Sequence, residues 1–311
     1  AEEFRAKFNN WYRRFRKRRG FSIRRRTSVG QKLPTGHEGM AWATLMKLRA
    51  ALLKRAGEDL TSEQLESVAA TVFEELGNMD QTPVQHEMPV ETTLEKRGAK
   101  DARISTGGKE KERFTLCLAV MANGSRVPLR IIFKGTPFIP PTKSGKGKST
   151  QPRKGWCDAR ECTLWISESW KLRPNNGSII KQRPSILVLD DFKCHRDEAF
   201  IADLQKKANT IVILIPGGLT PLLQPLDRML NKQMKRLLRG MYTAHTAKAV
   251  TDPKTGKLKP PGRGQVSTWC KEAWAQITPD LVKTCFKICG LTLALDDSED
   301  HAWCSHNFGE D

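Results

Sequence analysis

Aromatic residues recur at helical spacing near the start of the chain. Between residues 2 and 19 they stand four, three and four positions apart, at Phe4, Phe8, Trp11 and Phe15. Arginines occupy the opposite face, so the pattern predicts an amphipathic helix, which Gly20 ends. A second basic helix is expected to start within Ser22–Arg26, and Leu33–Gly36, with its proline and glycine, then breaks the pattern.

Two further helices are expected before the character of the chain changes near Val72. The first runs from about Met40 to Gly57. The second begins at Thr61, because Thr61 and Gln64 have the spacing of a capping box, in which each side chain bonds the backbone N–H of the other.

Short segments that predict strands follow. The first four are Leu76–Asp80, Arg103–Thr106, Phe114–Ala122 and Val127–Phe133. Asn123-Gly124 joins the last two and is a strong hairpin signal. Ser185–Asp190 and Thr210–Pro216 are continuous apolar runs, typical of strands that are buried on both faces.

Helices are expected between and after the later strands. They are predicted at Cys162–Leu172, Arg196–Ala208 and Leu226–Thr246, with two shorter ones after a basic linker at residues 251–264. A hairpin followed by strand, helix, strand and helix indicates an α/β fold, in which a mixed sheet is flanked by helices.

The chain is strongly basic, with 53 Lys and Arg against 34 Asp and Glu and a formal net charge of +19 over 311 residues. This balance favours a polyanionic partner, with nucleic acid ahead of a membrane surface. We find neither a run of about 18 apolar residues nor a secretory signal. The eight cysteines are scattered, as expected of reduced thiols inside a cell, and the basic cluster Arg13–Arg19 favours the nucleus.

Three aspartates occupy positions that suit metal binding. Asp80 closes the stretch Glu75–Asp80, Asp190 ends the apolar run Ile186–Asp190, and Asp227 opens a basic helical segment. Taken singly, each has an ordinary interpretation as a turn residue, a helix cap or a helix-terminal charge. Because strand ends and a helix start can converge on one point, the three together predict a site for two Mg²⁺ or Mn²⁺ ions over a phosphodiester.

The segments around these aspartates carry a resemblance. Asn78–Val84, Leu187–His195 and Gln224–Asp227 resemble, in this order, the three sequence blocks of pogo-like transposases. That group belongs to the mariner superfamily of DDE/D enzymes and includes domesticated jerky-type and centromere-protein-B-like relatives. Thirty-six residues separate Asp190 from Asp227, close to the spacing in that family.

The resemblance implies a ribonuclease-H-like catalytic core with Asp80, Asp190 and Asp227 as its catalytic and metal-binding triad. Asp191 is a possible helper. His195 has two open interpretations, a contact with phosphate or Asp190 and a purely structural hydrogen bond. The expected organisation is a helix-turn-helix remnant over residues 1–32, a helical linker over 33–71, the catalytic domain over 72–250 and a basic linker with helices over 251–311.

DNA is the expected partner. The block Trp11–Arg26 resembles the last part of the helix-turn-helix unit of the family. The candidate contacts are Arg13, Arg14, Arg16, Arg18, Arg24, Arg25, Arg26, Lys232 and Lys235. The implied activity is metal-dependent DNA cleavage with transfer of the freed 3′ end, performed by a homodimer on paired DNA ends. Two alternatives remain open: a domesticated DNA- or chromatin-binding protein without catalysis, and another ribonuclease-H-like nuclease.

Overall fold

The computed structural model describes residues 2–23, 33–57, 60–89, 94–96, 107–135, 155–174, 184–249, 251 and 257–308. Two compact units share these residues. The smaller unit takes its residues from 1–30, 86–112 and 239–261, and the larger from 31–85, 113–238 and 262–311. The expected strand Arg103–Thr106 and the arginines at 24–26 lie outside the described residues.

The smaller unit contains the predicted N-terminal helix, α1 (Glu2–Arg19), followed by Gly20 at a φ of 65°. The expected second helix is wrong for its first two residues. Ser22 and Ile23 belong instead to strand β1 (Phe21–Ile23), which pairs in antiparallel orientation with β3 (Leu94–Lys96). A strand partner 70 residues further along has overridden the local helical preference.

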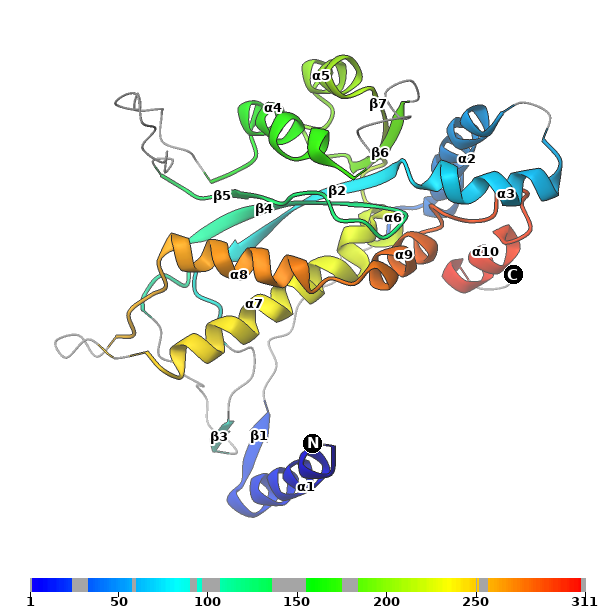
Figure 1. Cartoon of the computed structure of the whole chain (residues 1–311). Coiled ribbons are helices and arrows are strands. Elements are labelled where there is room, and N and C mark those ends of the chain that lie inside the picture. Colours follow the sequence, from blue (N-terminus) through cyan, green and yellow to red (C-terminus); the bar gives the residue numbers. More distant parts are fainter. Residues whose placement is uncertain are drawn as a thin grey trace, which may run out of the picture. The chain divides into compact units, whose positions relative to one another are not determined.

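A five-stranded mixed sheet forms the centre of the larger unit (Figure 1), in the order β5-β4-β2-β6-β7. Its strands are β2 (Leu76–Gln85), β4 (Arg113–Met121), β5 (Arg130–Ile132), β6 (Ser185–Asp190) and β7 (Thr210–Ile215). β2 runs antiparallel to β4 and parallel to β6, and β6 runs parallel to β7. The predicted strand Val127–Phe133 is shorter in the structure, because only residues 130–132 pair with β4.

β2 is longer than the sequence pattern predicts. It does not end at Asp80 but continues through Pro83 to Gln85. Its register with β6 covers only residues 76–78, so the later part of β2 has a ladder partner on the β4 side alone. Proline is tolerated at such a position, because its missing N–H leaves no donor unpaired there.

Helices cover both faces of this sheet. On one face lie α4 (Ala159–Glu168), the 3₁₀ turn Trp170–Leu172 and α5 (Glu198–Ala208). On the other lie α8 (Arg263–Ala275) and α9 (Pro279–Ile288) (Figure 1). The first face holds a large apolar core that includes the fully buried Trp165 and Trp170. Burial on both sides explains why β6 reads as an uninterrupted apolar run.

The segment after β7 differs in detail from the single helix predicted there. It consists of α6 (Thr220–Leu223), a π-helical turn (Leu226–Leu230) and α7 (Asn231–Thr246). π-Helical turns are rare and occur often at functional sites. This one carries Asp227.

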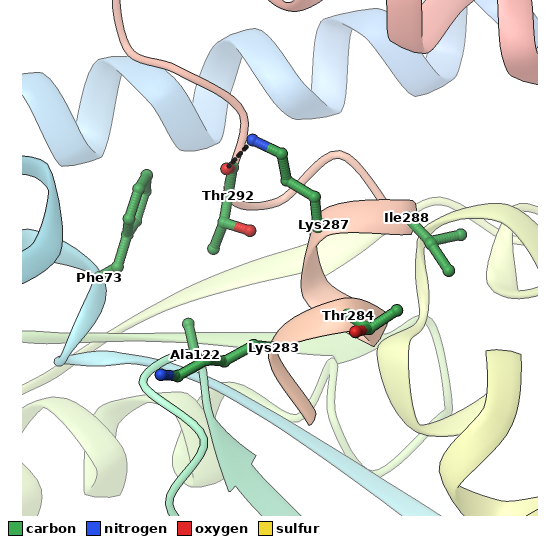
Figure 2. Close-up of a pocket in the computed structure, with 7 residues that line it drawn as sticks. All are labelled: Phe73, Ala122, Lys283, Thr284, Lys287, Ile288 and Thr292. Atoms are coloured by element: carbon green, nitrogen blue, oxygen red, sulfur yellow. Dashed lines mark hydrogen bonds between the residues drawn. The ribbon is translucent and has the colours of Figure 1, made fainter. Parts of the chain in front are cut away.

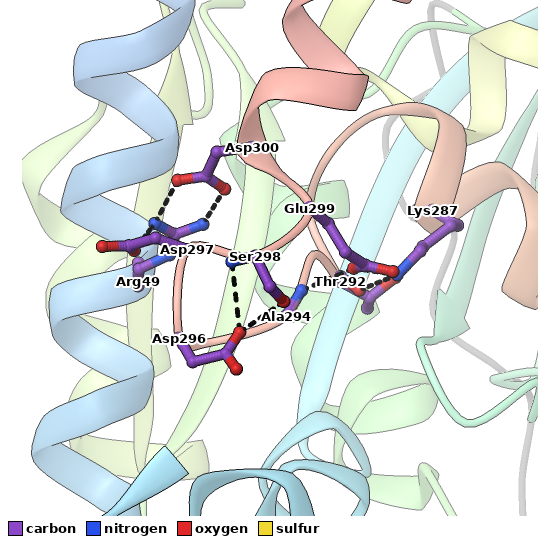
Figure 3. Close-up of polar contacts among 9 residues, drawn as sticks. All are labelled: Arg49, Lys287, Thr292, Ala294, Asp296, Asp297, Ser298, Glu299 and Asp300. Atoms are coloured by element: carbon purple, nitrogen blue, oxygen red, sulfur yellow. Dashed lines mark hydrogen bonds and ion pairs between the residues drawn. The ribbon is translucent and has the colours of Figure 1, made fainter.

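The remaining helices are α2 (His37–Ala56), α3 (Ser62–Phe73) and α10 (Asp300–Phe308). The capping box between Thr61 and Gln64 is present at the start of α3, as predicted. The sequence pattern did not predict α10. Figure 3 shows a long-range anchor at its start, where the Arg49 guanidinium bonds the Asp300 carboxylate and also pairs with Asp297.

Candidate active site

Asp80 and Asp190 stand on neighbouring parallel strands. The register pairs Leu76 with Ile186 and Asn78 with Val188, and Asp80 and Asp190, each two residues after the last pair, line the same pocket. Asp190 is the last residue of β6, as predicted. The backbone therefore brings together two carboxylates that are 110 residues apart in the sequence.

A buried amide network fixes the segment that carries Asp227 against these strands. Asn78 Nδ2 donates to the Val188 carbonyl at 2.9 Å and to Gln224 Oε1 at 2.7 Å. Gln224 Nε2 donates to the Met79 carbonyl at 2.9 Å, and the Leu226 N–H donates to Asn78 Oδ1 at 3.3 Å. Because Asn78 and Gln224 are both fully buried, these bonds set the position of the π-helical turn relative to β2 and β6.

Asn231 joins two of the three aspartates. Its Nδ2 donates to Asp80 Oδ2 at 2.5 Å and to Asp227 Oδ1 at 2.8 Å. Asn231 lies four residues after Asp227, which places both side chains on one face of the helical segment. The sequence offered that spacing as a signal, but sequence reasoning gave Asn231 no role.

Asp190 is held by His195. His195 Nδ1 lies 2.6 Å from Asp190 Oδ1, and its Nε2 lies 2.9 Å from Gln81 Nε2 on β2. The imidazole is 1% exposed, so it cannot reach into solvent. Of the two open interpretations, the orientation of Asp190 matches this geometry. Asp191 forms its ion pair elsewhere, with Arg196 Nε at 3.3 Å.

Burial and mutual repulsion shape the electrostatics of the cluster. Burial, followed by the nearby charges of Asp227 and Asp190, raises the pKa of Asp80 to about 7, although the hydrogen bond from Asn231 acts in the opposite direction. Burial opposes a charge on His195, but its bonds to Asp190 and Cys194 outweigh this and raise its pKa to about 10. Like-charged carboxylates that are removed from water need either a proton or a cation.

The donor set fits a hard divalent cation, because it consists of carboxylate oxygens with an amide beside them. The described residues do not form a ready-made cage, since no three His, Cys, Asp or Glu side chains among them are grouped closely enough to hold a metal ion. A pocket of about 120 Å³ opens beside two of the aspartates. Its lining comprises Asp80, Gln81, Pro83, Thr115, Trp156, Cys157, Asp190, Phe192 and His195.

Figure 2 shows a larger pocket, of about 460 Å³, which contains none of the candidate residues. It is lined by Phe73, Ala122, Lys283, Thr284, Lys287, Ile288 and Thr292. Lys287 donates to the Thr292 carbonyl at 3.2 Å and also pairs with Glu299. One of the two lysines that line this pocket is therefore already bonded within the protein.

The candidate DNA contacts belong to different parts of the chain. Arg13, Arg14 and Arg18 are exposed on α1, and Arg16 lies over the Tyr12 ring at 5.1 Å. Lys232 is exposed near the start of α7, and Lys235 is half-buried. Residues 24–26 fall outside the described residues, so their arginines have no structural account.

The chain resembles known proteins in both sequence and structure. Residues 111–286 match the family described as DDE superfamily endonuclease. That span contains Asp190 and Asp227 but begins after Asp80.

No helix in the described part of the chain is long and apolar enough to cross a membrane.

Two curated relatives support the predicted resemblance to pogo-like transposases, which is thereby confirmed. The human "Pogo transposable element with KRAB domain" is 30% identical over 295 residues, which are 94% of this chain and 45% of that protein. The mouse protein of the same name is 30% identical over 295 residues, 94% of this chain and 46% of its own length. The chain thus spans about half the length of the curated relatives it matches.

Solved structures of a mariner transposase share the fold. The Mos1 mariner paired-end complex with Mn superposes with a TM-score of 0.53 at 11% identity, covering 97% of this chain and 71% of that chain. The Mos1 strand transfer complex gives a TM-score of 0.51 at 11% identity, with 97% and 70% covered. The predicted ribonuclease-H-like fold, a mixed sheet flanked by helices, is confirmed.

Proposed function

Because the chain belongs to the DDE superfamily of endonucleases, we propose that it is a DNA transposase, or a protein derived from one, that cleaves DNA strands and transfers the freed 3′ ends. The observation that carries the proposal is the convergence of Asp80, Asp190 and Asp227. Asp80 and Asp190 line the same pocket, and Asn231 connects Asp80 and Asp227. Carboxylates from separate elements that lie near one another support metal-dependent phosphodiester chemistry, which needs such ligands for its ions.

In this proposal the triad holds two divalent ions, Mg²⁺ or Mn²⁺, through its carboxylate oxygens. When bound, these ions supply activation of the attacking oxygen and stabilisation of the leaving 3′ oxygen. His195 keeps the Asp190 carboxylate in one orientation through its 2.6 Å contact. The buried amides of Asn78 and Gln224 hold the Asp227 segment in place. The protein's part is thus to fix the directions of three carboxylates.

DNA is the proposed substrate. The net charge of +19 supports binding to its phosphates, and the exposed arginines on α1 offer one surface for that contact. We further propose that the protein acts in the nucleus and as a homodimer on paired DNA ends. The Mos1 structures, one of which is a paired-end complex with Mn, support a divalent ion for that relative.

The test is nicking of supercoiled plasmid in the presence of Mg²⁺ or Mn²⁺. Wild type is compared with Asp190→Asn and with the control Asp203→Asn, which changes a carboxylate on α5 that pairs with Lys207. We expect nicking by wild type and by the control, and its loss in Asp190→Asn with DNA affinity retained. A folded wild type that binds DNA but does not nick it would instead favour the non-catalytic DNA- or chromatin-binding protein.

A further inference from the structure

Asn231 is the one neutral side chain that contacts two of the clustered aspartates among the described residues. Its Nδ2 reaches Asp80 Oδ2 and Asp227 Oδ1, and the residue is 5% exposed. Its Oδ1 is buried and has no hydrogen-bond partner within the described part of the protein. A buried amide oxygen without a partner costs free energy, so this half of the side chain is unsatisfied while the other half bridges two carboxylates.

A cation bound by Asp80 and Asp227 is incompatible with this amide orientation. The N–H groups carry positive partial charge, and they occupy the carboxylate oxygens that the ion would need. Rotation of the terminal amide by half a turn exchanges nitrogen and oxygen, and both orientations fill nearly the same volume. The rotation would replace two donors by one oxygen at the position where Nδ2 now lies.

The spacing around that position suits a hard cation. Nδ2 lies 2.5 Å from one carboxylate oxygen and 2.8 Å from the other. Neighbouring ligands of an octahedral Mg²⁺ stand roughly 3.0 Å apart, given metal–oxygen distances of about 2.1 Å. An oxygen in place of Nδ2 would therefore lie within about 0.5 Å of the required separation from each of the two carboxylate oxygens.

We propose that Asn231 is a fourth residue of the metal site: its amide bridges Asp80 and Asp227 when no cation is present, and turns its oxygen to the cation when one binds. This inference rests on the proposed function. It predicts that removing the amide weakens divalent-ion binding itself, whereas a residue with only a structural role in α7 leaves the ion affinity unchanged.

The test measures Mn²⁺ binding to the whole chain by calorimetry, without DNA. Wild type is compared with Asn231→Leu, which keeps the volume but removes both polar atoms, and with Gln233→Leu, a half-exposed position two residues away. We expect about 10- to 100-fold weaker binding for Asn231→Leu and wild-type binding for Gln233→Leu. Wild-type affinity in a folded Asn231→Leu would overturn the inference.

A second measurement does not depend on a variant that folds. In ¹⁵N-labelled wild type, Mg²⁺ should shift the side-chain amide signals of Asn231 because both hydrogen bonds to carboxylates are lost. Unchanged signals at saturating Mg²⁺ would overturn the inference while leaving the triad intact. If wild type binds neither ion, or binds as Asp190→Asn does, the proposed metal site fails and the role of Asn231 fails with it.

Discussion

His195 links the two central strands of the sheet at the level of Asp190. One ring nitrogen lies 2.6 Å from the Asp190 carboxylate on β6, and the other lies 2.9 Å from the amide nitrogen of Gln81 on β2. Sequence reasoning left His195 between a contact with the site and a structural bond. The geometry matches the first interpretation, because the buried imidazole bonds the Asp190 carboxylate directly and so orients it.

Replacing His195 should therefore affect the site more than the fold. His195→Phe keeps an aromatic ring but removes both nitrogens. We expect metal-dependent nicking to fall by about 10- to 100-fold, as for residues that orient a metal ligand. We expect a loss of about 1–3 kcal/mol in stability, because Asp190 and Gln81 each lose a partner. Nicking rates and urea unfolding measure the two effects, and wild-type rates in the folded variant would show that His195 is structural only.

The raised pKa of Asp80 leads us to expect an unusual pH dependence of folding stability in the metal-free protein. Burial and the neighbouring aspartates raise its pKa from 3.8 to about 7. The folded state therefore binds the proton of the Asp80 carboxyl group more tightly than the unfolded state does. The stability that it provides is complete below pH 3.8 and is lost as the pH rises to about 7. The shift corresponds to at most about 4 kcal/mol.

Urea unfolding in EDTA at several pH values between 4 and 8 measures this loss. Asp80→Asn carries no ionisable group at this position, so its stability should decline less than that of wild type across the same range. Addition of Mg²⁺ at pH 7.5 should restore stability to wild type but not to Asp80→Asn, since an ion binds only the folded site. Parallel pH profiles for the two proteins would contradict the prediction.

The buried amides of Asn78 and Gln224 should behave as one unit. Each donates to a backbone carbonyl, and they share a bond of 2.7 Å. Asn78→Ala and Gln224→Ala should each cost about 1–3 kcal/mol, because each leaves buried polar groups without partners. The double variant should cost less than the sum, since the shared bond is lost only once. Chemical denaturation of the four proteins measures the coupling, and strict additivity would exclude it.

Much of the sheet could be predicted because its strands follow local patterns. β6 and β7 are continuous apolar runs, and Ser185–Asp190 was predicted with the same bounds as in the structure. The end of β2 could not be predicted in this way. Asp80 follows a short predicted strand and precedes Pro83, which resembles a strand end, yet pairing with β4 carries β2 on to Gln85. Pairing across the sheet decided the boundary.

The candidate site also contains residues that local sequence patterns indicate and one residue that they do not. The three aspartates could be proposed from the sequence because the segments around them resemble the blocks of a known family and each follows or opens a recognisable pattern. Asn231 could not, because its significance depends on Asp80, which lies 151 residues away in the sequence. β1 is the corresponding case in the fold, since its partner β3 lies far along the chain and its own three residues carry no decisive signal. Long-range partners, which local patterns do not encode, account for both omissions.

We expect the arginines of α1 to make a salt-dependent contribution to DNA affinity. Arg13, Arg14 and Arg18 are exposed on a helix whose last turn is entirely basic. Each arginine that neutralises a phosphate releases counterions, so the affinity falls with salt in proportion to the number of such contacts. Replacing all three by glutamine should reduce the slope of log K against log salt by up to about 3.

A charge-preserving variant separates charge from shape. Lysines at the same three positions keep the positive charges but lack the planar guanidinium. If α1 contacts phosphates alone, the lysine variant should keep the salt slope of wild type on duplexes of unrelated sequence, while the glutamine variant loses it on all of them. A glutamine variant with an unchanged slope would remove α1 from the DNA-binding surface. A lysine variant that weakens on one duplex only would instead indicate that these arginines read base edges, since a bidentate contact to guanine depends on the guanidinium.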